Sequence, residues 1–231
     1  MTIICGIRGK DHILLGCDSW SYDKKRKYAG PSIKYSVINN GNMGIGVVTS
    51  GATSVLGNES RRPLREVFEH VNIIHEMYRD KIKSTKNFID YLELEFIKEL
   101  ELLKDVMFEE ETNEINREDL RNSFLIYKFL VGGCFNNILH LEFLNLTFES
   151  DYHVKVSRKK IMQTNQLYFD GTSIVKGDYA KKLATKLISD SGTLPKNKRI
   201  IKNYMEKMIS YDIKNNPKLD PNFFGRTIGE N

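Results

Sequence analysis

The sequence predicts an α+β fold built on mainly antiparallel sheets. Short apolar runs typical of strands occupy 2–49 and 123–169, whereas apolar residues recur every three to four positions in 64–107 and 175–213. Short turns, rather than helical crossovers, join the strands. This connectivity favours antiparallel pairing, with the helices segregated to the outer faces. The predicted order is strands, two helices, strands and two helices.

Four strands are predicted in the first fifty residues, at 2–8, 12–18, 33–38 and 43–49. The first two form a β-hairpin around the turn residues 9–11. A polar stretch ending at Pro31 separates this hairpin from the third strand. Glycines inside the fourth strand indicate that another part of the backbone approaches it closely.

The remaining elements repeat this order along the chain. Helices are predicted at 64–78, 88–107, 175–187 and 200–213, and strands at 123–134, 138–144, 152–156 and 167–169. Ser84 and Thr85 offer a hydroxyl cap for the second helix. The acidic stretch 108–121 is expected to be an exposed connection. Because no internal repeat or linker divides the chain, we expect a single domain, 1–231.

Composition excludes several classes of protein. With 40% apolar and 28% charged residues, the 231-residue chain has enough apolar material for a core and is not of disordered type. Its 35 basic and 30 acidic residues give a net charge of +5. Basic residues concentrate only at 24–27 and 196–199, without the aromatic context of a nucleic-acid reader, so nucleic acid is an unlikely partner. No apolar run approaches the ~20 residues of a membrane helix, and the start lacks the layout of a secretory signal; we expect a cytoplasmic location and no membrane partner.

Cysteine and histidine positions do not predict a metal site. Cys5, Cys17 and Cys134 are an odd number with no close pair, which indicates buried free thiols. His70 and His75 are five residues apart, off the helix face that a metal-binding pair prefers. We expect no metal and no organic cofactor.

Thr2 is the first candidate catalytic residue. Removal of Met1 would give Thr2 a free α-amino group, so that one residue would carry both a nucleophilic hydroxyl and a base. An α-amine titrates at about 7.7–8.0 in peptides, so a useful fraction can accept the hydroxyl proton at neutral pH. This chemistry needs a cation that keeps the amine neutral and an anion that positions the cation.

Asp18 and Lys34 are candidates for those two charges. Asp18 ends the second predicted strand and Lys34 lies in the third. Taken singly, an Asp or a Lys in such a place is more often an exposed residue or a turn cap. The combination of Thr2, Asp18 and Lys34 is what indicates a catalytic site.

The pattern resembles the proteasome β-type subunits, including the bacterial relatives HslV and Anbu. The similar features are Thr2 through Val48, the turn at Asp18, Lys34 on the next strand, Ser50-Gly51-Ala52 where the fourth strand is expected to turn into the first helix, the strand ending in Gly132-Gly133, and Asp170-Gly171-Thr172-Ser173. The resemblance implies an N-terminal nucleophile hydrolase fold, a four-layer αββα sandwich. It also implies assembly of identical subunits into a ring.

The resemblance assigns further roles. Thr2 matches the nucleophile, Asp18 the carboxylate that pairs with the lysine, Lys34 the lysine that lowers the proton affinity of the amine, and Gly51 the donor of an oxyanion N–H group. Thr172 or Ser173 matches a serine that holds the amine, Asp220 matches a supporting aspartate, and Ser21, Ser32 and Thr49 fall near the specificity pocket. The implied activity is a threonine-type endopeptidase acting on a peptide or unfolded-protein substrate, with an ATPase unfoldase as a possible partner.

Some features depart from that family and leave two alternatives open. Trp20 replaces a usual basic residue, the stretch 108–121 looks like an insertion, and only seven residues follow Phe224. If Met1 is retained, Thr2 has no free amine; the chain would then be an inactive ring subunit that serves structurally or binds peptides. The same hydrolase chemistry could also serve another amide.

Overall fold

Two compact units make up the chain in the computed structural model. The structure describes residues 3–23, 28–40, 43–51, 54–56, 63–108, 127–148, 153–171 and 177–215. The first unit combines Met1–Lys34 with Met162–Asn231, and the second is Tyr35–Ile161. Unit 2 is therefore inserted in the sequence of unit 1.

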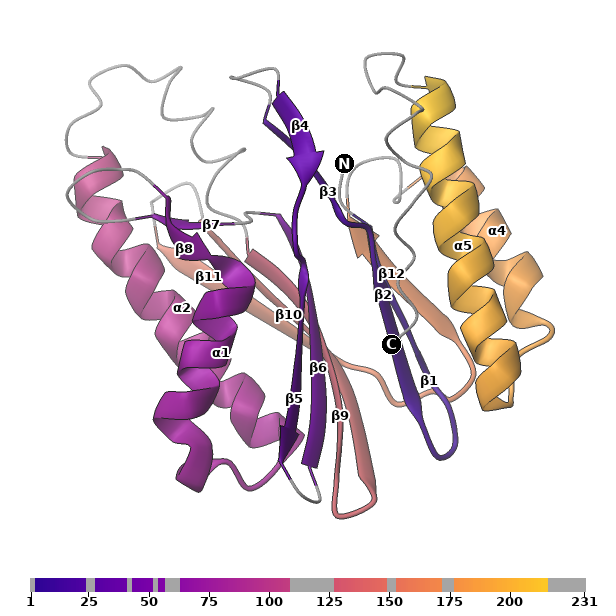
Figure 1. Cartoon of the computed structure of the whole chain (residues 1–231), viewed down its shortest axis with the longest axis horizontal. Helices are drawn as coiled ribbons and strands as arrows, with labels where there is room; N and C mark the ends of the chain where they lie inside the picture. The colour runs from indigo at the N-terminus through magenta and orange to yellow at the C-terminus, as the bar shows by residue number, and fades with distance from the viewer. Residues whose placement is uncertain are drawn as a thin grey trace. The chain divides into compact units, whose positions relative to one another are not determined.

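The first unit is a three-stranded antiparallel sheet with two helices on one face (Figure 1). Its strands are β1 (Ile3–Arg8), β2 (Ile13–Cys17) and β12 (Leu167–Gly171), in the order β12-β1-β2, and its helices are α4 (Asp178–Ile188) and α5 (Leu194–Asn215). The central strand β1 contributes Ile3, Cys5 and Ile7 to a core that α4 and α5 cover, with Leu183 and Tyr204 among the helix residues. A separate two-stranded sheet joins β3 (Trp20–Asp23) and β4 (Tyr28–Pro31).

The second unit has a five-stranded antiparallel sheet, and α1 and α2 cover one face of it (Figure 1). Its strands, in the order β11-β10-β9-β6-β5, are β5 (Tyr35–Asn40), β6 (Met43–Gly51), β9 (Tyr127–Phe135), β10 (Ile138–Phe148) and β11 (Val154–Lys160). The helices are α1 (Val67–Tyr78), the short 3₁₀ helix η1 (Arg79–Lys81) and α2 (Thr85–Phe108), and a small sheet joins β7 (Ser54–Leu56) to β8 (Pro63–Glu66). Apolar side chains of α1, α2 and the sheet form its core.

Local signals in the sequence explain several boundaries. The Asn87 N–H donates to Ser84 Oγ over 3.0 Å, so Ser84 caps α2 as expected. Asn136 and Asn137 both have positive φ, 47° and 63°, as a two-residue hairpin turn requires. Every strand pair in the described residues is antiparallel, which confirms that part of the prediction.

Some predicted boundaries were wrong. The hairpin of β3 and β4 lies in the stretch interpreted only as polar, and β7 and β8 lie between Gly51 and the first helix, where no strand was predicted. That helix begins at Val67 and not near Gly51, because Glu66 closes a capping box with Glu69. The last helix begins at Leu194 and not at residue 200, where the apolar repeat starts. Pro195 lies in its first turn, where a helix tolerates proline.

Other expectations stay predictions. The acidic stretch 108–121 lies outside the described residues apart from Phe108. The sandwich layering and the single domain stay predictions. In the part of the chain that the structure describes, no helix is both long and apolar enough to cross a membrane.

An ionic network joins the edge strand β11 to α2. Arg158 donates to Asp90 Oδ1 over 2.6 Å and to Glu142, which also contacts His140 at 2.6 Å. Burial alone would raise the pKa of Glu142, but the hydrogen bonds from His140 and Arg158 lower it to about 2. Glu142 is therefore ionised at neutral pH and keeps Arg158 in place.

Gly133 is required where α2 starts against the sheet. A Cβ atom at Gly133 would lie 2.6 Å from Thr85 Oγ1 and 2.8 Å from the Gly44 carbonyl oxygen. Gly133→Ala should therefore lower the free energy of unfolding by about 1–3 kcal/mol, because the backbone of β6 would have to move. Urea denaturation measures this. In the control Gly44→Ala the nearest atom, Asn39 Oδ1, is 3.4 Å away; an equal loss in both variants would contradict this packing.

His70 should make stability depend on pH. Desolvation in the core of unit 2, together with nearby Arg65, lowers the pKa of His70 from 6.5 to about 4. The folded state then binds fewer protons than the unfolded state between these values, so stability is fully present above pH 6.5 and decreases toward pH 4. Urea denaturation should show a loss of up to about 3 kcal/mol across this window.

Two leucine variants isolate this contribution. His70→Leu should remove the loss between pH 6.5 and 4, because no imidazole remains to be protonated in the unfolded state. His153→Leu, at an exposed position, should keep it. Identical pH profiles for the wild type and His70→Leu would contradict the assignment.

Candidate active site

A lysine and an aspartate form a buried ion pair in the first unit. Lys34 Nζ lies 2.9 Å from Asp18 Oδ2, and the two residues are 1% and 3% exposed. Burying a charge without a partner costs several kcal/mol, so each group depends on the other. The structure thus brings two of the predicted site residues together.

The pairing of β1 with β2 positions Asp18. The ladder runs from Arg8 opposite Ile13 to Ile4 opposite Cys17, and one step further the Asp18 N–H donates to the Ile3 carbonyl oxygen over 3.1 Å. The Ile3 N–H donates in return to Asp18 Oδ1 over 2.6 Å. The carboxylate therefore accepts a backbone N–H on one oxygen and an ammonium on the other, at the residue that follows Thr2.

A hairpin that the sequence did not predict returns the chain to this point. In the β3–β4 pair, Trp20 lies opposite Pro31 and Ser21 opposite Gly30. Beyond it, the Ser32 N–H donates to the Ser19 carbonyl oxygen over 2.8 Å, which aligns the two strand ends. Lys34 comes two residues later, immediately before β5 rather than inside a strand as predicted. The alternation around Tyr22 and Tyr28 was the available signal for this hairpin.

The end of β12 also reaches the start of β1. Gly171 lies opposite Ile3, and Asp170 opposite Ile4. The next residue along the chain, Thr172, is a predicted site residue. The described strand ends of β1, β2 and β12 therefore converge on Ile3, since it pairs with Gly171 on one side and with Asp18 on the other.

Two residues of the predicted specificity pocket, Ser21 and Ser32, lie in unit 1. Ser32 Oγ is buried and has no hydrogen-bond partner among the described residues. Such an atom is expected to bind a water molecule or a ligand. Ser21 lies in β3 opposite Gly30, and its side chain is outside the described part.

Gly51 and Thr49 belong to the second unit. Thr49 is 3% exposed, and Gly51 ends β6 opposite Tyr127 with a φ of 94° that favours glycine. No helix begins there, so the expected helix N-terminus behind the Gly51 N–H is a wrong prediction. The neighbouring Ser50 Oγ is buried without a hydrogen-bond partner in the described residues, and sequence reasoning gave it no role.

The remaining predicted site residues are not described. Thr2, Thr172, Ser173 and Asp220 lie outside the described residues. Among those that are described, no group of three or more His, Cys, Asp and Glu side chains could hold a metal ion.

Cys17, next to Asp18, is not an activated thiol. All three cysteines are free, as predicted, but only Cys5 is fully buried; the expectation of burial was wrong for Cys17 and Cys134, which are partly exposed. Burial and the neighbouring Asp18 charge raise the pKa of Cys17 to about 12, and burial raises the pKa of Cys5 strongly. A protonated thiol is a poor nucleophile. Among described residues near the ion pair, these cysteines are therefore unsuited to nucleophilic catalysis at neutral pH.

Comparisons with known proteins give similarity only at the level of solved structures. No family model matches the chain, and no curated protein matches it. An Anbu mutant from Hyphomicrobium sp. strain MC1 is 10% identical with a TM-score of 0.49, over 95% of this chain and 78% of that one. Anbu (ancestral beta-subunit) from Yersinia bercovieri is 11% identical with a TM-score of 0.39, over 91% of this chain and 96% of that one.

The ion pair should contribute strongly to stability. Lys34→Met removes the lysine that binds the buried Asp18 carboxylate. We expect it to lower the free energy of unfolding, measured by urea denaturation, by about 3–5 kcal/mol. Asp18→Asn should cost a similar amount. The double variant should cost less than the sum of the two single variants, because it removes both buried charges together.

An exposed ion pair provides the matched control. Lys98 Nζ lies 2.7 Å from Glu95 Oε1 on α2, and the lysine side chain is 54% exposed. Lys98→Met should change the free energy of unfolding far less than Lys34→Met does, because solvent screens an exposed pair. A Lys34→Met variant no less stable than Lys98→Met would contradict the described pair.

Proposed function

We propose that this chain is a threonine-type endopeptidase subunit of the proteasome β class, with Thr2 as its nucleophile once Met1 is removed. One observation carries the proposal: the Asp18 carboxylate binds the Ile3 N–H and the buried Lys34 ammonium together. Ile3 is covalently joined to Thr2. A cation is thus held in a desolvated setting near the start of β1, where an N-terminal nucleophile needs one.

Lys34 and Asp18 have separate roles in this proposal. The Lys34 ammonium disfavours a second positive charge near it, so a nearby α-amine stays neutral and can accept a proton. The low dielectric around a lysine that is 1% exposed strengthens that repulsion. Asp18 positions the lysine and compensates its charge without touching the substrate.

The proposed reaction is acyl transfer to Thr2. The Thr2 hydroxyl oxygen attacks the peptide carbonyl carbon while its proton passes to the Thr2 amine. The protonated amine then gives that proton to the leaving amine as the C–N bond breaks, which leaves an ester on Thr2. A water molecule hydrolyses the ester and restores the hydroxyl group.

Other predicted residues complete the proposed site. We assign the Gly51 N–H to the oxyanion, now without a helix dipole behind it. Thr172 or Ser173 would hold the amine, and Asp220 would support it. Ser21, Ser32 and Thr49 would line the specificity pocket, for which the unpartnered Ser32 Oγ is a suitable polar group.

The proposal extends to the whole chain and its partners. We propose that the two units are halves of one domain in a four-layer sandwich, and that identical subunits assemble into a ring. The substrate class is peptides or unfolded protein, with an ATPase unfoldase as a possible partner.

A second candidate function follows from the same ion pair. The Asp18 carboxylate already has a structural role, because it binds the Ile3 N–H at the end of the β1–β2 ladder. A chain that retained Met1 would keep this bond and would lack the free Thr2 amine. It would be an inactive ring subunit that serves structurally or binds peptides.

Thr2→Ala should leave the fold intact and abolish peptide hydrolysis, because the nucleophilic oxygen is lost. Activity is measured on mixed fluorogenic peptides with protein purified after Met1 removal. Thr2→Ser should retain activity, since it keeps a hydroxyl group beside the amine. Thr185→Ala, which removes an exposed hydroxyl on α4, is the matched control and should leave the rate unchanged. Hydrolysis by Thr2→Ala at the wild-type rate would exclude Thr2 as the nucleophile.

A further inference from the structure

The net positive charge of the chain comes from residues 177–215, which include the helices α4 and α5. Residues 177–215 contain nine Lys and Arg but only four Asp and Glu, a net charge of +5. The rest of the chain has 26 basic and 26 acidic residues and is neutral. The excess positive charge is therefore concentrated on the two helices that cover the first unit's sheet.

Most of these basic side chains are exposed and form no ion pair within the described part of the chain. Lys196 and Arg199 both bind Asp190, the first over 3.2 Å. Seven further lysines are exposed, and none forms an ion pair with a described residue: Lys181, Lys182, Lys186, Lys198, Lys202, Lys207 and Lys214. An excess of exposed positive charge attracts an anionic partner.

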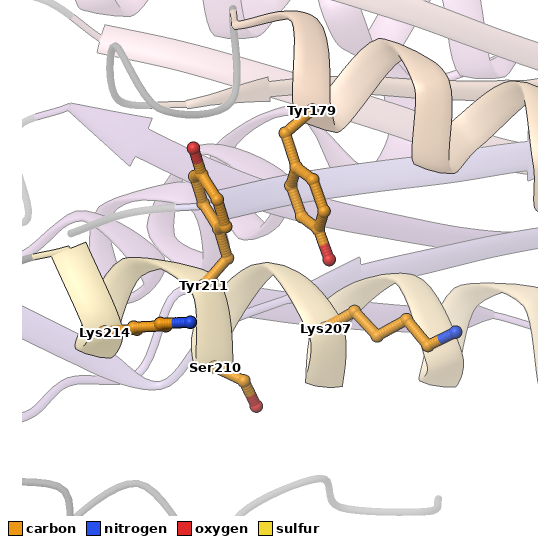
Figure 2. A pocket seen from close by; sticks show the side chains of 5 residues that line it. All are labelled: Tyr179, Lys207, Ser210, Tyr211 and Lys214. Atoms are coloured by element: carbon orange, nitrogen blue, oxygen red, sulfur yellow. The ribbon is translucent and has the colours of Figure 1, made fainter.

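A groove between the two helices lies inside this charged surface. Tyr179 of α4 stacks on Tyr211 of α5, with ring centroids 4.1 Å apart and planes 12° from parallel. Figure 2 shows Lys207 and Lys214 on α5 on either side of the tyrosine pair. These four residues and Ser210 line a pocket of about 460 Å³. The groove therefore combines ammonium groups with phenol hydroxyls, all of which can donate hydrogen bonds to carboxylates.

Helical spacing extends the basic character along the groove. Lys182 and Lys186 follow Tyr179 at three and seven residues and so share its face of α4. On α5, Lys207 and Lys214 flank Tyr211 at four and three residues. Together these four lysines and the two tyrosines form what we call the basic groove.

The same chain contains a segment of opposite charge. Residues 109–120 hold six acidic residues and one basic residue, a net charge of −5. Its acidic residues include three successive glutamates, 109–111. The net charge of this segment is thus equal in size and opposite in sign to that of residues 177–215.

We propose that the basic groove of one copy of this chain binds the acidic segment 109–120 of a second copy. The contact is head-to-tail, because the two surfaces that meet are different. Such contacts propagate and close into a ring when the rotation between copies permits. The inference rests on the assembly part of the proposed function and does not depend on the chemistry of Thr2.

A pair of charge-reversal variants tests the contact in the full-length chain. The groove variant changes Lys182, Lys186, Lys207 and Lys214 to Glu. The segment variant changes Glu109, Glu110, Glu111 and Glu114 to Lys. Self-association is measured by sedimentation velocity at about 50 mM and about 500 mM salt, since salt screens such contacts.

Each variant alone should associate at least about tenfold more weakly than the wild type at low salt, because its two surfaces now repel. An equal mixture of the two variants should associate again, since each groove then meets a segment of opposite charge. The matched control reverses four exposed lysines of the second unit, Lys81, Lys83, Lys86 and Lys98, and should associate like the wild type.

Several results would overturn the contact. These are a monomeric wild type at low salt, a groove variant that associates like the wild type, or a mixture that stays dissociated. Loss of RNA binding by a groove variant that still self-associates would assign the groove to nucleic acid instead. Labelling of Thr2 by a threonine-directed inhibitor, measured in the same samples, separates a failure of this contact from a failure of the proposed chemistry.

Discussion

A carboxylate with two different donors organises the start of this chain. Asp18 accepts the Ile3 N–H at 2.6 Å and the Lys34 ammonium at 2.9 Å, with almost no exposure to solvent. Each bond satisfies a group that would be costly to bury alone. The ladder between β1 and β2, the return of the β3–β4 hairpin and the pairing of Gly171 with Ile3 all meet at this point. The first unit can therefore hold a cation away from water only because its strand ends converge here.

The Asp18–Lys34 pair can serve both a structural and a catalytic role. Replacing a buried ion pair by apolar residues is often neutral or stabilising, so stability is a weak reason for burying a lysine. A catalytic role explains the buried charge, because the Lys34 ammonium would keep a neighbouring amine neutral. The adjacent thiols offer no alternative nucleophile, because burial and the Asp18 charge raise the pKa of Cys17 to about 12.

The sequence predicted the elements that local patterns determine. Short apolar runs predicted β1, β2, β5, β6, β12 and the meander of β9 to β11, and a three-to-four repeat predicted the helices. Ser84 capped α2 as its hydroxyl group indicated. The β3–β4 hairpin was missed because the alternation around Tyr22 and Tyr28 is short and lies in a stretch interpreted only as polar. The first helix was placed too early because the capping interaction at Glu66, not the first apolar residue, decides where it begins.

Among the candidate site residues that the structure describes, Asp18 and Lys34 are the two that the sequence related and that lie together. Their contact depends on a hairpin that brings residue 34 back beside residue 18, which is a tertiary effect that no local pattern contains. For Gly51 the prediction was right only in part. Its φ of 94° explains why glycine is needed there, but the helix that was expected to follow it is not found. The charge balance of α4–α5 was present in the sequence, but the pocket that Lys207 and Lys214 line together with the stacked Tyr179 and Tyr211 depends on the packing of the two helices.

The central claim is that Thr2 becomes a reactive N-terminal residue beside the Asp18–Lys34 pair. Mass spectrometry of the chain from its native host, with and without a threonine-directed electrophile, tests this most directly. The account predicts a chain that lacks Met1 and carries one adduct, which peptide mapping assigns to Thr2. A fully retained Met1, or a processed chain whose Thr2 takes up no electrophile, would contradict it.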